Sequence, residues 1–103
     1  MIELSSKQRK NLEKAAHHLE SVVLVGGAGV TDSLVKMVDK CLADHELIKV
    51  KFNEYKEEKL ELSKKIESET NSTLVRVIGN IATFYRAKDE ILKRQYEKLL
   101  QRV

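Results

Sequence analysis

Residues 22–32 read Val-Val-Leu-Val-Gly-Gly-Ala-Gly-Val-Thr-Asp, and this stretch decides how the chain folds. It begins as an uninterrupted apolar, β-branched run, which is typical of a buried parallel strand. Three glycines within four positions end the run, and Thr31 or Asp32 can then cap a helix. A strand, a glycine turn and a helix in this order predict the first part of a β-α-β unit.

The apolar patterns on either side extend this unit into an α/β domain. One helix is predicted to start at Ser5, where Gln8 completes a capping box, and a charged helix is predicted from Glu54 to Thr70. Strands are predicted at residues 21–25, 48–52, 74–78 and 81–85, with Gly79-Asn80 turning the last two into a hairpin. The order α-β-α-β-α-β-β predicts a two-layer domain with a four-stranded mixed sheet, in which the first three strands are parallel and the hairpin adds an antiparallel one.

The end of the chain, from Ala87 onward, is predicted to form a further helix. Its apolar residues share one face at helical spacing, and they are Leu92, Tyr96, Leu99, Leu100 and Val103. We therefore divide the chain into a domain over residues 1–86 and an amphipathic helical tail over residues 87–103.

Length and composition limit the possible functions. The chain has 103 residues, 42% of them hydrophobic and 34% charged, which suits one globular domain. No apolar run approaches the roughly 20 residues of a membrane span, the start of the chain lacks the pattern of a signal peptide, and the single cysteine excludes an internal disulfide. These features predict a cytoplasmic protein without a membrane partner. The net charge of +3 permits a polyanionic partner without demanding one.

The glycine loop matches neither of the common nucleotide-binding motifs. A Rossmann fingerprint would need a third glycine where Asp32 stands, and a P-loop would need a lysine after the glycines. What remains is G-x-x-G, formed by Gly26, Gly27, Ala28 and Gly29. Such a loop lets backbone amides approach a phosphate chain, and the helix start near Thr31 adds a favourable positive end. The alternative is a tight turn that binds nothing.

Basic side chains near this loop are candidates for neutralising a phosphate backbone. Lys49 and Lys51 share one strand face, and Arg76 and Arg86 lie on neighbouring strands. The first helix adds three further candidates, namely Lys7, Arg9 and Lys10. For all of these residues, an ordinary solvated surface is the alternative reading.

No catalytic or metal-binding set emerges from the sequence. The three histidines, His17, His18 and His45, lack the spacing of a metal site, and Cys41 has no evident base near it in sequence. We expect Cys41 to be a small core residue. The sequence therefore predicts a protein that is not an enzyme and needs no cofactor or small-molecule substrate.

Several ordered stretches resemble a known family. They are Ser6-Lys7-Gln8-Arg9, Ala16-His17-His18-Leu19, Val25-Gly26-Gly27-Ala28-Gly29-Val30-Thr31, His45-Glu46-Leu47-Ile48-Lys49-Val50-Lys51, Val77-Ile78-Gly79-Asn80 and Tyr85-Arg86. Together they resemble YhbY-like, stand-alone CRM domains (chloroplast RNA splicing and ribosome maturation) over about residues 5 to 86. The resemblance implies an RNA-binding domain similar in fold to the C-terminal domain of bacterial translation initiation factor three. It also implies association with ribosomal RNA or precursors of the large ribosomal subunit, and a role in their assembly.

Carried onto this chain, the resemblance assigns RNA contact to the loop from Gly26 to Gly29, to Lys49 and Lys51, and to Arg86. Many relatives carry a lysine or polar residue inside the loop, whereas this chain has Gly27 and Ala28, so the loop itself supplies no charge. A rival hypothesis makes the protein an interaction adaptor. In that case the amphipathic tail docks in a partner's groove and the glycine loop is only a turn.

Overall fold

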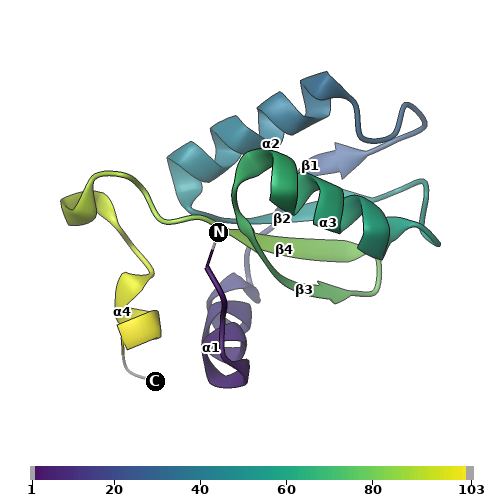
Figure 1. Cartoon of the computed structure of the whole chain (residues 1–103). Helices are drawn as coiled ribbons and strands as arrows, with labels where there is room; N and C mark the ends of the chain where they lie inside the picture. Colours follow the sequence, from purple (N-terminus) through teal and green to yellow (C-terminus); the bar gives the residue numbers. More distant parts are fainter. Residues whose placement is uncertain (1, 102–103) are drawn as a thin grey trace.

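Four strands form one mixed sheet in the computed structural model, which describes residues 2–101 (Figure 1). The strands are β1 (Ser21–Val25), β2 (Leu47–Phe52), β3 (Thr73–Ile78) and β4 (Ile81–Tyr85), arranged in the order β1-β2-β4-β3. β1 and β2 are parallel, and β4 is antiparallel to both β2 and β3. The first three strands therefore run in one direction, as predicted, and the hairpin places β4 between β2 and β3.

Three helices precede the first, second and third strands along the chain, and they pack on the sheet. They are α1 (Ser6–Ala16), α2 (Asp32–His45) and α3 (Lys59–Thr70). The α-β-α-β-α-β-β order is thus confirmed. The predicted capping box also forms, since the Ser5 hydroxyl accepts from the Gln8 amide and the Gln8 side chain accepts from the Ser5 amide.

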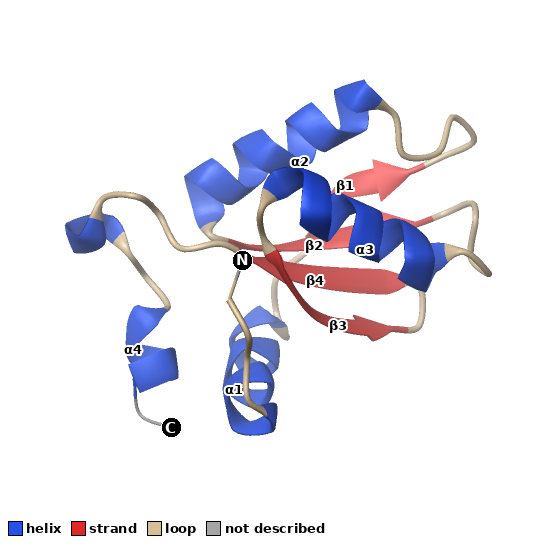
Figure 2. Cartoon of the chain, viewed as in Figure 1, coloured by secondary structure: helices blue, strands red, loops and turns tan. Residues whose placement is uncertain are grey.

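The helices cover both faces of the sheet, so the predicted two-layer arrangement is wrong (Figure 2). The residues Ile48 and Phe84 face α2 and α3 and belong to the main core, whose other members include Val38, Leu42 and Ile66. Their neighbours Leu47 and Tyr85 point to the opposite face, where they form a second core with Leu12 and Ala16 of α1. Because both faces of the central strands carry apolar residues at this end, each face needs a covering helix.

The predicted start of α3 at Glu54 is wrong, because residues 53–58 form a loop. Tyr55 has φ +57°, which an α-helix does not allow, and α3 begins only at Lys59. The amides of Asn53 and Glu54 both donate to the carbonyl oxygen of Val25, at 3.0 and 3.2 Å. This loop is therefore bonded to the end of β1 rather than extended into the helix.

The tail does not form the predicted amphipathic helix. Residues 91–93 make one 3-10 turn, and the only α-helical piece in the described part of the tail is α4 (Glu97–Gln101). The carboxylate of buried Glu46 accepts hydrogen bonds from the amides of Lys88 and Gln95, at 2.8 and 2.5 Å. The tail then bends back so that α4 lies beside α1, as Figure 1 shows in yellow.

The apolar residues of the tail are consequently divided. Tyr96 and Leu100 pack against the second core, whereas Leu92 is fully exposed. Val103 and the side chain of Leu99 lie outside the described residues. Within residues 87–101, the described apolar side chains thus do not share the single face on which the adaptor hypothesis depended.

Candidate nucleic-acid interface

The glycine loop connects β1 to α2 at one end of the sheet. Its turn is closed by a hydrogen bond from the Gly29 amide to the Gly26 carbonyl oxygen, at 3.0 Å, and Gly29 has φ +74°. Gly27 and Ala28 form the exposed tip. Thr31 caps α2, because its hydroxyl accepts from the Leu34 amide at 3.1 Å. The loop therefore presents backbone to solvent directly before a capped helix, which is the arrangement that the sequence predicted.

Tyr55 holds the loop from the neighbouring segment, and sequence reasoning missed it. Its hydroxyl donates to the Gly27 carbonyl oxygen at 2.8 Å. Its ring lies so close that a Cβ on Gly29 would be 3.4 Å from it. The spacing of apolar residues predicted a helix at Tyr55, so the sequence pattern could not reveal this contact with the loop. The loop is therefore supported by a specific contact and is not merely a connection.

Carboxylates flank the loop on the side of Tyr55. An open cavity there is lined by Gly27, Asn53, Glu54, Tyr55, Lys56, Glu57 and Glu58. It contains a single lysine against three glutamates, and Asp32 stands in the first turn of α2. Any cations that assist this loop in holding phosphate must therefore come from elsewhere on the surface.

Lys49 and Arg86, both predicted to contact RNA, are engaged with the protein's own backbone. The Lys49 ammonium donates to the carbonyl oxygens of His17 and Leu19, at 3.3 and 3.1 Å. The Arg86 guanidinium donates to the Asp39 carboxylate at 2.6 Å, and to the Thr70 and Asp39 carbonyl oxygens at 2.7 and 2.9 Å. Both side chains thus link secondary-structure elements, which the sequence could not reveal.

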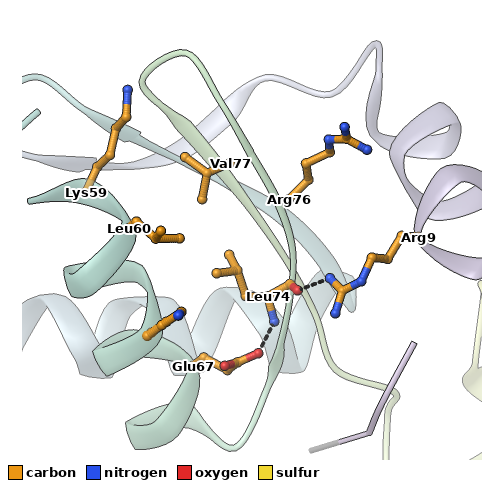
Figure 3. A pocket seen from close by; sticks show the side chains of 8 residues that line it. Arg9, Lys59, Leu60, Glu67, Leu74, Arg76 and Val77 are labelled. Carbon is orange, nitrogen blue, oxygen red and sulfur yellow. Dashed lines mark hydrogen bonds between the residues drawn. The ribbon is translucent and has the colours of Figure 1, made fainter. Parts of the chain in front are cut away.

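The remaining predicted residues fall into two groups. Lys7, Lys10 and Lys51 are exposed, the first two on α1 and the third on β2. Arg9 and Arg76 instead meet at the outer edge of β3 (Figure 3). Arg9 donates to the carbonyl oxygens of Leu74 and Val75, at 2.6 and 2.7 Å, and Arg76 forms an ion pair with Glu13 at 3.1 Å.

A groove of about 470 Å³ runs along this edge, between β3, α1 and α3. We call it the β3 groove, and its lining residues are Arg9, Lys59, Leu60, Lys64, Glu67, Leu74, Arg76 and Val77. Lys59 and Lys64 were overlooked at the sequence level, because they belong to a helix with many charges of both signs. Only the fold brings them beside Arg9 and Arg76.

The described part of the chain holds neither a metal-binding cluster nor a reactive thiol. Within residues 2–101, no group of three or more His, Cys, Asp or Glu side chains is placed to hold a metal ion. The thiol of Cys41 packs against the main core, and burial together with Asp44 raises its pKa. A thiol with a raised pKa stays protonated at neutral pH and is a poor nucleophile. None of the helices described is long and apolar enough to cross a membrane.

Known proteins resemble this chain in sequence and in structure. An RNA-binding protein of Haemophilus influenzae is 40% identical over 91 residues, covering 87% of this chain and 92% of that protein. The probable RNA-binding protein YqeI of Bacillus subtilis is 34% identical over 88 residues, covering 84% of this chain and 92% of that protein. The solution structure of the hypothetical protein SAV1595 from Staphylococcus aureus matches with a TM-score of 0.75 at 32% identity. That match covers 90% of this chain and 98% of SAV1595.

The family itself follows from a match along most of the chain. The sequence model of the CRS1/YhbY (CRM) domain aligns with residues 4–86, which contain α1 to α3 and all four strands. The resemblance inferred from the sequence is thereby confirmed. From this match and from the relatives, the chain belongs to the CRS1/YhbY (CRM) domain family, a family of non-catalytic domains.

Proposed function

We propose that this protein binds RNA and assists the assembly of the large ribosomal subunit in the cytoplasm, with ribosomal RNA or its precursor particle as the partner. The observation that carries RNA binding is the family match over residues 4–86, together with relatives that are named as RNA-binding proteins. The role in ribosome assembly rests on the family resemblance alone. We further propose that residues 1–86 form the RNA-binding domain and that residues 87–103 form an accessory tail.

In this proposal the glycine loop contacts phosphates through its backbone. The exposed tip at Gly27 and Ala28 and the start of α2 support that role, because helix starts and exposed amides favour anions. Lys51, Lys7 and Lys10 are exposed and can add neutralising charge. Lys49 and Arg86 are assigned a smaller share of the contact, since each is already bonded to carbonyl oxygens.

The experiment compares binding of large-subunit ribosomal RNA fragments across a salt series. Wild type should show a log–log salt slope of roughly −2 to −4, as a few phosphate contacts require. Gly27→Asp/Ala28→Asp should weaken binding at least about tenfold, because two carboxylates would face the phosphates. Met37→Asp/Ser68→Asp is the matched control, since it adds two carboxylates at exposed positions of α2 and α3.

The outcomes separate the parts of the proposal. No binding by wild type at low salt would refute RNA binding. Equal binding by the loop variant and the control would instead show that the loop is only a turn. The assembly role is checked by sedimentation: the wild-type protein should travel with precursors of the large subunit and not with the small subunit.

A further inference from the structure

The β3 groove concentrates the positive charge of the molecule. Four of its lining residues are cationic, namely Arg9, Lys59, Lys64 and Arg76, and one, Glu67, is anionic. Their formal sum of +3 equals the net charge of the entire chain, so the other residues together sum to zero. This edge of the sheet therefore carries a net positive charge that attracts a polyanion.

The contacts already made inside the groove leave most of this charge uncompensated. Arg9 is bonded to two carbonyl oxygens, which carry no net charge, and Lys59 is 3.3 Å from the side-chain oxygen of Asn80. Arg76 is the exception, since it is paired with Glu13. The carboxylate of Glu67 faces the strand and accepts from the Leu74 amide, as Figure 3 shows. Lys64 is exposed.

Apolar side chains lie between the cations. Leu60, Leu74 and Val77 occupy the middle of the groove in Figure 3, between Lys59 on one side and Arg9 and Arg76 on the other. The side chain of Leu60 is 52% exposed although it is a large apolar residue. An apolar strip bordered by cations matches a nucleotide, whose base or ribose needs an apolar surface and whose phosphates need positive charge.

The edge of β3 also argues against a peptide as the occupant. An acidic peptide that added a strand here would need the outward amides and carbonyls of β3. Arg9 already occupies the carbonyls of Leu74 and Val75, and Glu67 occupies the Leu74 amide. RNA needs no such pairing, because cations and apolar side chains are sufficient to hold it.

We infer that the β3 groove binds a single-stranded segment of RNA, as a second contact on the same RNA that the glycine loop holds. The inference rests on the proposed RNA-binding function. The loop follows β1 at one edge of the sheet, and the groove lies at the other edge, across β2 and β4. At a spacing of about 4.8 Å between neighbouring strands, the two edges are roughly 14 Å apart, so one RNA segment reaches both.

The test uses Lys59→Ala/Lys64→Ala in the full chain, with Lys36→Ala/Lys40→Ala on α2 as the matched control. Each double variant removes two lysines from a helix, and both control lysines are exposed. With a large-subunit ribosomal RNA fragment as the probe, the groove variant should bind about tenfold more weakly at ~0.1 M salt, and its slope should fall by about 1.4, which corresponds to two phosphates of a single strand. The control should stay within about twofold of wild type.

A second pair of variants tests the apolar strip without changing charge. Leu60→Ala should weaken binding about threefold and leave the salt slope unchanged, since no cation is lost. Met37→Ala is its control, because Met37 is a helical residue of equal exposure, 53% against 52% for Leu60. Thermal unfolding of every variant shows whether the domain stays folded.

The outcomes distinguish failure of the groove from failure of RNA binding altogether. If wild type binds no RNA, both proposals are overturned. If wild type binds but the groove variants match their controls, only the groove is refuted. A third result would also overturn the inference. In it, a polyglutamate peptide binds wild type but not Lys59→Ala/Lys64→Ala, while that variant keeps its affinity for RNA. The groove would then bind an acidic protein segment.

Discussion

Two glycines of the same loop, Gly27 and Gly29, differ in whether the structure has room for a side chain at that position. Gly29 has φ +74°, and a Cβ there would lie 3.4 Å from the ring of Tyr55. At Gly27 a Cβ would have nothing within 4 Å and the backbone is not left-handed. The structure therefore requires glycine at position 29, whereas position 27 is open to a side chain.

Gly29→Ala should lower the free energy of unfolding by about 1–2 kcal/mol, because alanine is strained at positive φ and crowds the tyrosine ring. Gly27→Ala should change it by less than about 0.5 kcal/mol. Denaturant unfolding of both variants checks the difference. Similar values for the two would mean that the loop relaxes away from Tyr55.

Tyr85 should make stability depend on pH in the alkaline range. Its burial, and secondarily the negative charge of Glu46, raise the pKa of the phenol to about 12, against a partly opposing effect of Arg94. The fold favours the neutral phenol, so the stabilisation is complete below the unfolded-state pKa of about 10 and is lost as the pH rises toward 12. The free energy of unfolding should therefore fall over this window.

Spectrophotometric titration of the tyrosines provides the measurement. Wild type should show a late tyrosinate step near pH 12, and Tyr85→Phe should lack it. The variant should also lose less stability than wild type between pH 10 and pH 12. A tyrosinate titration with no late step would contradict the raised pKa.

At the scale of elements, one carboxylate determines the course of the tail. Glu46 is fully buried, has φ +65° and accepts the amides of Lys88 and Gln95, while its own carbonyl oxygen accepts the Arg86 amide at 2.8 Å. Three oxygens of Glu46 thus bind the segment after β4, while its amide closes α2 by donating to the Leu42 carbonyl oxygen.

Glu46→Ala should cost about 2–3 kcal/mol, because two part-buried amides lose their acceptor. Hydrogen exchange should rise selectively over residues 87–101, and Glu46→Gln, which keeps one acceptor oxygen, should be intermediate. The exposed Asp44→Ala serves as the control. Unchanged exchange in the tail would show that the packing of Tyr96 and Leu100 holds it alone.

The regular elements could be predicted from the sequence, and the connections could not. The strands and the caps at Ser5 and Thr31 are encoded by neighbouring residues, so local patterns reveal them. The loop at Tyr55 and the bent tail depend on single contacts across 28 to 49 residues of sequence. The same limit applies to the candidate site, because Lys51 and Lys49 look alike in sequence while only Lys49 is bonded to backbone carbonyls.

At the scale of the whole molecule, Arg86 joins the end of β4 to α2 and α3. Its guanidinium reaches Asp39 in α2 and the carbonyl oxygen of Thr70 in α3 at the same time. A planar fork of donors can do this, whereas an ammonium group cannot reach all three acceptors in that geometry. The side chain therefore stabilises the arrangement of the layers, not one local turn.

Arg86→Lys separates this architectural role from phosphate binding, because it keeps the positive charge and loses the fork. We expect the free energy of unfolding to fall by about 2 kcal/mol, with RNA affinity within about twofold of wild type under folding conditions. Calorimetry and the RNA assay give the two values. A large loss of affinity with unchanged stability would assign Arg86 to the RNA instead.

The hydrogen bonds at the outer edge of β3 bear on whether a second chain can pair with this strand. An uncovered edge strand is a template on which a second chain can pair and start a growing fibril. Here Arg9 of α1 donates to the carbonyl oxygens of Leu74 and Val75, and Glu67 of α3, on the opposite face of the sheet, accepts from the Leu74 amide. The two side chains thus block the addition of a further strand at Leu74 and Val75.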